Sequence, residues 1–593
     1  MNLFRFSRFF LPSQNPIGFG ASDFIALGLA VLLAVVFLLR HRMEAAAGRL
    51  AARTSVSMVL VGALPVALRL ALLGQHPVPT PRVADDFSYL LLADTLAHFR
   101  LANPMHPMRR FFEGVFILQE PSYSSIFPPG QGLALACGQL IFGHPWAGVL
   151  LSTAAFCALC YWMLRAWVAP GRSLAGGLLA ALEFGPLSPW MNTYWGGAVS
   201  AAAGCLVFGA LPRIKRNARS RDAVLLGVGL GLQLLTRPYE FVLLLLIVFL
   251  FFLPDVAHAL PRAVSRLFST PVLAQKDGDG TSADAARRSA CATLAIAALI
   301  MMPAIALTAF QNRAVTGRWT TLPYMLSRTQ YGIPTTFTFQ PNPIPHRELT
   351  VEQKVDYDEQ TATHGKDTDT VASWFERLGE RVLFFRFFLL APLYLALFAF
   401  IVSLREYRFI WVVLAIAVFW IGDNFYPYFY PHYVAAAACL FVLISVKGLE
   451  RLSLLTIRGI AVGQEAARLI LLLCLAHFLF WYGIHLSGNQ NLMRVMSQYE
   501  SWDEINYGDP EGRIAIDNRL AAAPGSQLVF ARYRPQHGST EWIRNAADID
   551  RARVVWALDL GPEENEKLRR YYPNRKAWLL EPDLHPPKLV DYP

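Results

Sequence analysis

The sequence predicts an all-α polytopic membrane protein with about twelve transmembrane helices, followed by a small C-terminal α/β module. Three observations predict this fold class. Of the 593 residues, 54% are hydrophobic and only 16% are charged, whereas a soluble protein usually carries about 25% charged residues. Apolar runs of roughly the length of a transmembrane helix recur through most of the chain. Basic residues gather in short clusters between these runs, as they do in cytoplasmic loops.

The formal net charge of +10 does not indicate a nucleic-acid partner. The basic residues are spread over several short connectors, and the chain has no extended Lys/Arg tract and no nucleic-acid motif. We therefore expect membrane lipid around the chain and no nucleic acid.

The first two apolar runs, roughly 21–39 and 55–73, set the predicted orientation. The connector between them is basic and contains Arg40, Arg42, Arg49 and Arg53. By the positive-inside rule this connector is cytoplasmic. The loop 75–130 is then expected on the outer side of the membrane, facing the periplasm or the cell exterior. We expect the multi-pass chain in the bacterial inner (plasma) membrane.

Charge parity orders the remaining runs. The apolar run 133–142 is shorter than the roughly 20 residues that a helix needs to cross, so we expect it to lie at the interface. If it crossed, the basic cluster Arg213–Arg221 would face outward, against the positive-inside rule. The other predicted spans are 146–168, 174–187, 198–211, 223–236, 239–253, 290–310, 382–403, 409–422, 433–446 and 467–484.

These boundaries predict two domains. Residues 1–485 form the transmembrane domain, with large outer loops at 75–130 and 311–381. Residues 486–593 form an extracytoplasmic α/β module. Its strand signals alternate with helical stretches, as in small α/β folds. The predicted strands are Gln527–Tyr533, Val554–Leu558 and Ala577–Leu580, with a helix over Pro562–Arg570.

Polar and charged side chains at membrane depth are costly, so those near the predicted outer face are candidates for function. The most prominent are Asp85 and Asp86, two adjacent carboxylates at the start of the first outer loop. The same face is expected to carry Glu120, Tyr123, Trp195, Arg237, Tyr239, Glu240, Arg313, Arg328 and His432.

Three short stretches on this face carry a resemblance. They are Asp85-Asp86, the turn Ser125-Ile126-Phe127-Pro128-Pro129-Gly130, and Thr236-Arg237-Pro238. Together with the many spans over roughly 50–450, they resemble the GT-C superfamily of polytopic glycosyltransferases, which includes protein O-mannosyltransferases and lipid A aminoarabinose transferases. The resemblance implies transfer of a sugar from a polyprenyl-phosphate carrier to an extracytoplasmic acceptor, which could be a glycan, a lipid or a protein.

The residue types suit an inverting transfer of this kind. Asp85 or Asp86 could take the proton of an acceptor hydroxyl, which contributes typically ~10²–10⁴-fold, or hold a divalent metal such as Mg²⁺ or Mn²⁺. Arginine suits bidentate contact with phosphate oxygens. The candidates for the lipid phosphate are Arg237, Arg313, Arg328 and His432. The candidates for stacking on a sugar are Tyr123, Trp195 and Tyr239, with Glu120 and Glu240 as further substrate-binding acids.

Each candidate also has a structural interpretation. Asp85 could cap a helix, Arg237 could pair with Glu240 three residues on, and His432 could be an interfacial histidine. Two other functions remain open at this point. One is a transporter or flippase, although such proteins usually place polar groups near mid-membrane on broken helices. The other is a non-catalytic assembly factor for envelope polysaccharide.

Overall fold

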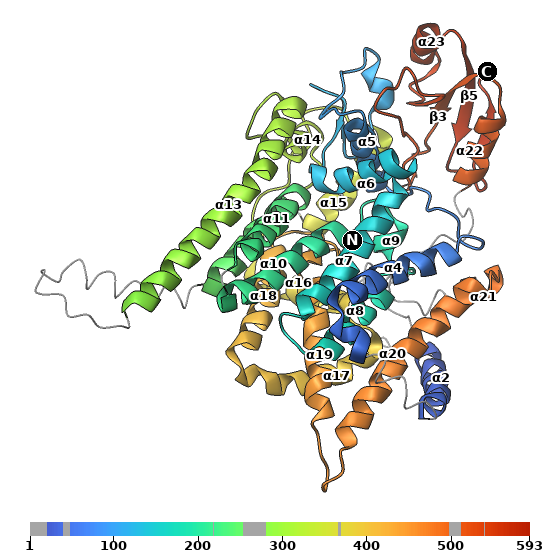
Figure 1. Ribbon diagram of the computed structural model, residues 1–593. Helices are drawn as coiled ribbons and strands as arrows, with labels where there is room; N and C mark the ends of the chain where they lie inside the picture. Colours follow the sequence, from blue (N-terminus) through green and yellow to red (C-terminus); the bar gives the residue numbers. More distant parts are fainter. Residues whose placement is uncertain are drawn as a thin grey trace, which may run out of the picture.

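The computed structural model describes residues 21–38, 48–217, 219–252, 280–365, 369–496, 512–535, 537–538 and 540–593. The described chain is a helical bundle with an α/β module at one end (Figure 1). The helical fold class and the C-terminal sheet predicted from the sequence are confirmed.

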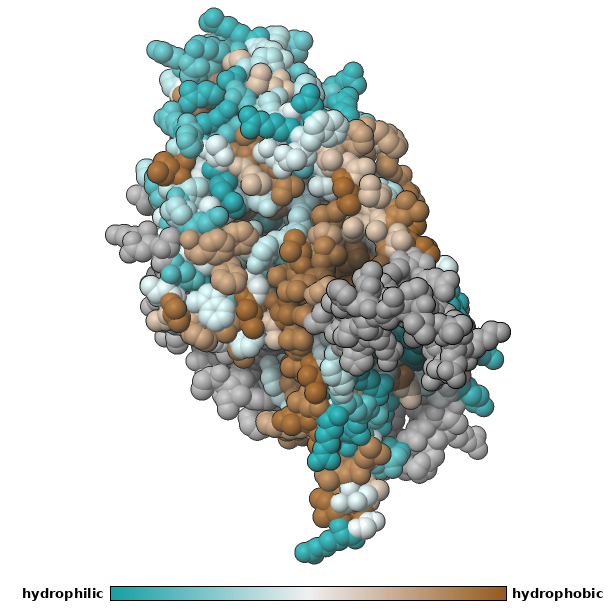
Figure 2. All heavy atoms as spheres, turned by 90° about the vertical axis from the view of Figure 1, so that its left-hand side faces the viewer, coloured by the Kyte–Doolittle hydropathy of each residue, from teal (hydrophilic) through white to brown (hydrophobic). Residues whose placement is uncertain are grey.

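Five described helices are long and apolar enough to cross a membrane, and each coincides with a predicted span. They are α4 (Thr54–Ala71), α7 (Trp146–Leu164), α10 (Ala198–Asn217), the part Thr293–Thr316 of α13 (Gly280–Thr316), and α20 (Val462–Leu486). One face of the molecule carries a band of hydrophobic residues beneath a hydrophilic cap (Figure 2). This pattern is the one expected of a chain embedded in a bilayer with a polar domain above it.

The count of about twelve transmembrane helices is not confirmed. The other predicted spans form α2 (Ala21–Leu38), α8 (Pro170–Glu183), α11 (Ser220–Thr236), the helix Pro238–Phe252, α18 (Tyr407–Asp423) and α19 (Ala438–Ser453). All of these except α2 have 14 to 17 residues, below the ~20 that cross in a straight helix.

The predicted span 382–403 is broken rather than continuous. It consists of 3₁₀ turns at Leu383–Phe388, Ala391–Leu393 and Ile401–Arg405, with α17 (Tyr394–Phe400) between them. Hydrophobic composition marks a segment as buried or lipid-facing, but it does not report such breaks in the helix.

The first outer loop is an ordered subdomain. It contains α5 (Ala84–Ala97), a 3₁₀ helix at Arg109–Phe112, an antiparallel pair formed by β1 (Ile117–Leu118) and β2 (Ser124–Ser125), and α6 (Pro129–Phe142). Helix α6 begins at Pro129, has 14 residues and ends at Gly143 with φ +78°. It packs against α5 and α7, and its length agrees with the predicted non-crossing helix.

The second outer loop contains three helices: α14 (Pro323–Tyr331), α15 (Val351–His364) and α16 (Val371–Val382). Thr350 begins α15 with a capping box. Its hydroxyl accepts from the Gln353 backbone N–H (3.2 Å), and the Gln353 side chain accepts from the Thr350 N–H (3.1 Å). Such reciprocal bonds satisfy two backbone donors at a helix start.

The C-terminal module is a four-stranded sheet in the order β4-β3-β5-β6. Strands β4 and β5 run parallel to β3, and β6 runs antiparallel to β5. The elements are α22 (Arg513–Ala522), β3 (Ser526–Ala531), β4 (Val554–Leu558), α23 (Pro562–Tyr571), β5 (Arg575–Glu581) and β6 (Lys588–Asp591). The three predicted strands and the helix are therefore confirmed, and β6 was not predicted.

The module docks on the first outer loop at the end of the bundle that carries α5 and α6 (Figure 1). One buried cluster joins Phe111 and Tyr123 of the loop to Phe530 of β3. Polar contacts reinforce it, since the Ala547 N–H donates to Asp94 Oδ2 at 2.7 Å. The module therefore helps to hold the loop that carries Asp85 and Asp86.

Candidate active site

Asp86 accepts backbone hydrogen bonds at the start of α5. Its Oδ2 accepts from the backbone N–H groups of Arg82 (3.0 Å) and Val83 (3.5 Å), and its Oδ1 accepts from that of Tyr194 (2.8 Å). The side chain is 2% exposed. Burial raises the pKa of Asp86, while the three backbone donors act against this rise. Asp86 thus ties α5 to the segment before it and to the 194 loop, and both of its oxygens are occupied.

Asp85 is the chemically available member of the pair. It is half-buried and is the second residue of α5. Burial, and then the neighbouring Asp86 charge, raise the pKa of Asp85 to about 7, while Arg237 lowers it. A carboxyl with a pKa near the working pH is well matched to general-base chemistry.

Arg237 is the residue directly after α11. Its guanidinium carbon lies 4.7 Å from the centre of the Tyr433 ring, over its face. Arg237 also interacts electrostatically with Asp85 and Glu240. Within the described chain its guanidinium forms no hydrogen bond, so its five N–H donors are left for a ligand.

The start of α6 packs closely against the end of α11. A Cβ on Gly130 would lie 2.5 Å from Thr236 Oγ1 and 2.9 Å from the Leu235 carbonyl oxygen. Only glycine permits this approach. The Pro-Pro-Gly turn and the Thr-Arg-Pro stretch, separate in the sequence, are therefore in direct contact.

Aromatic side chains line the site beyond Arg237. The Trp195 ring centre lies 4.6 Å from that of His432 and 6.2 Å from that of Tyr430. Burial, and then the Arg237 charge, lower the pKa of His432 well below its usual range. His432 is therefore neutral near pH 7 and does not provide the positive charge that a phosphate-binding role would use.

Tyr239 and Glu240 extend the wall from the first turn of the helix Pro238–Phe252. The Tyr239 hydroxyl donates to the Gly422 carbonyl (2.7 Å), and its ring centre lies 5.4 Å from that of Tyr426. Glu240 is 5% exposed and interacts with Arg237. The expected Arg237–Glu240 pairing is thus present as an electrostatic interaction.

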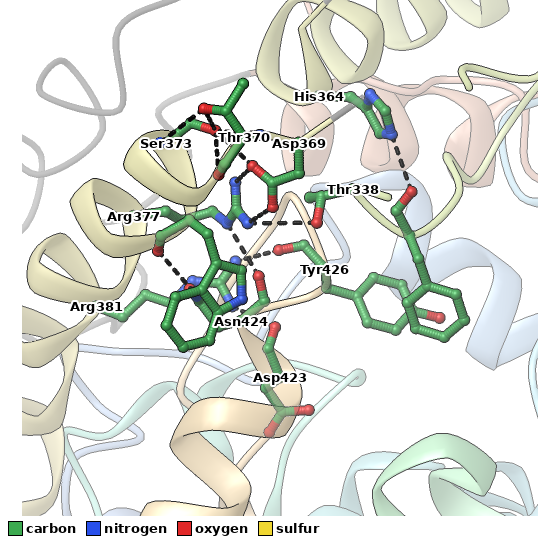
Figure 3. Close-up of polar contacts among 12 residues, drawn as sticks. Thr338, His364, Asp369, Thr370, Ser373, Arg377, Arg381, Asp423, Asn424 and Tyr426 are labelled. Carbon is green, nitrogen blue, oxygen red and sulfur yellow. Dashed lines mark hydrogen bonds and ion pairs between the residues drawn. The ribbon is translucent and has the colours of Figure 1, made fainter. Parts of the chain in front are cut away.

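Helix α16 fixes the loop behind this wall (Figure 3). Arg377 donates to the Asn424 carbonyl (3.0 Å) and forms an ion pair with Asp369. Arg381, one turn later, donates to the carbonyls of Asp423 and Tyr426. The two arginines therefore hold the 423–426 loop, which carries the Tyr426 ring to Tyr239.

Four predicted site residues have other partners. Glu120 forms ion pairs with Arg109 and Arg347. Tyr123 is 2% exposed, and its hydroxyl donates to the Asn545 carbonyl (3.2 Å), so its ring is not open to a sugar. Arg313 is exposed at the end of α13 and donates to the Gly317 carbonyl.

Arg328 is the fourth of these residues. It donates to the carbonyls of Pro334 (3.1 Å) and Thr335 (2.9 Å). Its guanidinium therefore stabilises the fold of the second outer loop. The guanidinium carbon lies 5.7 Å from the centre of the Tyr324 ring.

Asp356 on α15 is a site residue that the sequence reasoning missed. Burial, followed by the Asp85 charge, raises the pKa of Asp356 to about 8, and its Oδ2 accepts from Gln360 Nε2 (2.7 Å). The second outer loop is rich in acids, and the single sequence signal for this one is weak. It is the spacing Glu352, Asp356, Gln360, which places three polar side chains on one face of a helix.

The divalent-metal hypothesis stays a prediction. Among the residues that the structure describes, no three His, Cys, Asp or Glu side chains form a group that could hold a metal ion. Asp86 directs both oxygens to backbone N–H groups. Asp85 and Asp86 are the two carboxylates that would hold such an ion.

Comparisons with known proteins identify similar folds. No protein-family model matches the chain, and no curated protein matches it. Among solved structures, the chain is similar to ArnT from Cupriavidus metallidurans in the apo state, with 12% identity, a TM-score of 0.47, and coverage of 88% of this chain and 92% of that one. The structure of that ArnT bound to undecaprenyl phosphate gives 11% identity and a TM-score of 0.46, with coverage of 88% and 92%.

The archaeal oligosaccharyltransferase AglB from Archaeoglobus fulgidus, in complex with an inhibitory peptide and a dolichol-phosphate, is also similar. It gives 13% identity and a TM-score of 0.41, and covers 89% of this chain and 69% of that one.

Proposed function

We propose that this protein is a membrane glycosyltransferase that moves a sugar from a polyprenyl-phosphate carrier to an acceptor on the extracytoplasmic side of a bacterial inner membrane. The observation that carries the proposal is that Asp85 and Arg237 lie near enough to interact electrostatically. Asp85 has a pKa of about 7, and Arg237 has no hydrogen bond within the described chain. Transfer from a phosphate-linked donor needs such a base and such a cation on opposite sides of the reacting carbon.

Asp85 is the proposed general base. Its carboxylate takes the proton of an acceptor hydroxyl as the acceptor oxygen forms a bond to the anomeric carbon. The bond from that carbon to the phosphate oxygen breaks, and the lipid phosphate leaves with the electron pair. Attack opposite to the leaving group inverts the anomeric carbon. A positioned base of this kind contributes typically ~10²–10⁴-fold.

Arg237 is the proposed ligand of the departing phosphate. Negative charge develops on this group as its bond to the sugar breaks, and a guanidinium can meet two of its oxygens at once. Tyr433 holds the guanidinium by its ring face, which leaves the N–H groups free to donate. Trp195 and Tyr239 are the proposed rings beside the sugar, and Glu240 is placed to set the orientation of Arg237.

The test uses the purified protein with a labelled polyprenyl-phosphate sugar and a cell-envelope extract as the source of acceptors. Asp85→Asn should lower transfer by ~10²–10⁴-fold without lowering thermal stability. Asp358→Asn is the matched control, because Asp358 is an exposed acid on α15 paired with Lys354. It should leave transfer unchanged.

Asp86→Asn separates the two aspartates. The amide would direct N–H groups at backbone donors, so the variant should lose stability, by ~1–3 kcal/mol, rather than activity per folded molecule. Full transfer by Asp85→Asn would refute Asp85 as the base. Movement of the lipid-linked sugar across the membrane without any transfer product would favour the flippase instead.

A further inference from the structure

Two buried acids meet where three parts of the chain converge. Glu352 lies in the first turn of α15, in the second outer loop. Glu541 belongs to the C-terminal module. The segment beside them, Gly114-Val115, belongs to the first outer loop, and it also accepts a hydrogen bond from Gln353 Nε2 to the Gly114 carbonyl (3.3 Å). The junction therefore links both outer loops to the module.

Glu541 is supplied with donors. Its Oε2 accepts from the Val115 N–H (3.2 Å), and its Oε1 accepts from the N–H groups of Trp542 (3.1 Å) and Ile543 (2.9 Å). The residue is 3% exposed. Hydrogen bonds from backbone donors stabilise the ionised form of a carboxyl, and backbone N–H groups occupy both oxygens of Glu541.

Glu352 has the opposite surroundings. It is 4% exposed, and in the part of the chain that the structure describes neither of its oxygens meets a donor at hydrogen-bonding geometry. The groups that face it are the Glu541 carboxyl, the Tyr533 hydroxyl, which itself accepts from the Trp542 N–H (3.1 Å), and this N–H. The hydroxyl and the N–H act against the rise in the pKa of Glu352. Two ionised carboxylates in such a place would repel and lose hydration, whereas one proton between them makes a hydrogen bond.

Helix α15 connects the contact between Glu352 and Glu541 to the candidate active site. Asp356 lies four residues after Glu352 on the same helix and interacts with both Asp85 and Glu541. Whatever docks the first turn of α15 therefore also sets the distance of Asp356 from Asp85.

We propose that Glu352 and Glu541 share one proton, carried by Glu352, and that this contact positions α15 and the module against the loop that holds Asp85. Both acids are positioning residues. The docking itself does not depend on the chemistry of the site, and only its effect on transfer rests on the proposed function.

A pH dependence follows from the shared proton. Burial, and then Glu541, raise the pKa of Glu352 well above its usual range. Docking is therefore strongest below the usual carboxyl range and weakens as pH rises through the raised pKa. The other ionisable groups around the pair are Tyr533 of the module, Arg513 of α22, whose side chain donates to the Glu541 carbonyl, and Asp356 of α15.

The test is amide hydrogen exchange of residues 351–364 in the full-length protein from pH 5 to 9, with each rate divided by its intrinsic value. In the wild type the protection of α15 should fall as pH rises, by up to about tenfold per pH unit, the slope for one released proton. Glu352→Gln keeps a donor toward Glu541 at every pH, so its protection should stay high and flat. Glu541→Gln places an amide N–H group against backbone N–H donors, so the protection of α15 in this variant should be low at every pH.

Glu348→Gln is the matched control, because Glu348 lies just before α15 on the surface, paired with Arg110. It should follow the wild-type curve. A wild type with pH-independent protection, or a Glu352→Gln variant that still follows the wild-type curve, would overturn the proposal. Since exchange is read without any substrate, a failure here is distinct from a failure to find sugar transfer.

Discussion

Gly130 and Thr236 pack so closely that a Cβ on Gly130 would lie 2.5 Å from the threonine hydroxyl oxygen. They come from segments about a hundred residues apart, and each adjoins a proposed functional element. Gly130 follows the Pro-Pro turn that starts α6, and Thr236 precedes Arg237. This contact fixes the distance between the α5–α6 wall and the arginine.

Gly130→Ala should therefore damage the site. The new methyl group meets the Leu235 backbone as well as the Thr236 side chain, and backbone cannot rotate away. Overpacking of this kind typically destabilises by ~1–3 kcal/mol. We expect a lower thermal transition and a raised KM for the lipid donor. Gly171→Ala is the control, because a Cβ there meets nothing within 4 Å, and both measurements should match the wild type.

The pH profile of transfer reports on Asp85. Because its pKa is raised to about 7 and a base acts in its ionised form, kcat/KM should rise with pH up to about pH 7 and then level off. Ionisation of this carboxyl disfavours the folded state, so stability should fall over the same rise in pH. A profile that is flat between pH 5 and 8 would contradict Asp85 as the base.

Arg237→Lys tests the phosphate contact. Lysine keeps the charge but loses the planar pair of donors and the stacking on Tyr433. A hydrogen bond to a charged group contributes about 1.5–3 kcal/mol, so the KM for the lipid-linked donor should rise by about 10- to 100-fold. Arg313→Lys is the control, since Arg313 is exposed and donates to the nearby Gly317 carbonyl. Equal effects of the two variants would argue against a specific role for Arg237.

The sequence could predict what depends on local pattern. Hydrophobic runs located the five helices that are long and apolar enough to cross a membrane, and short strand signals between helical stretches located β3, β4 and β5. Charge parity also predicts that Asp85 and Arg237 share the outer face. The division of labour between Asp85 and Asp86 could not be predicted, because it depends on the Tyr194 N–H, more than a hundred residues away, reaching Asp86.

The surroundings of several other residues could not be predicted from the sequence, because they depend on distant segments. Tyr123 is buried by the C-terminal module, and Glu120 forms an ion pair with Arg347 of the second outer loop. Asp356 can be recognised as a site residue only once α15 is placed near Asp85. Long-range docking decides which polar residues face a substrate and which serve the fold.

The orientation of the whole arrangement can be measured by cysteine labelling in intact cells. Met105 lies exposed in the first outer loop, and Asn217 lies exposed at the basic end of α10. In a variant with Cys137 replaced by serine, Met105→Cys should react with a membrane-impermeant maleimide, while Asn217→Cys should react only after the membrane is opened. The physical reason is the basic end of α10, which the positive-inside rule keeps cytoplasmic. Labelling of Asn217→Cys in intact cells with Met105→Cys protected would turn the site toward the cytoplasm and remove the extracytoplasmic acceptor.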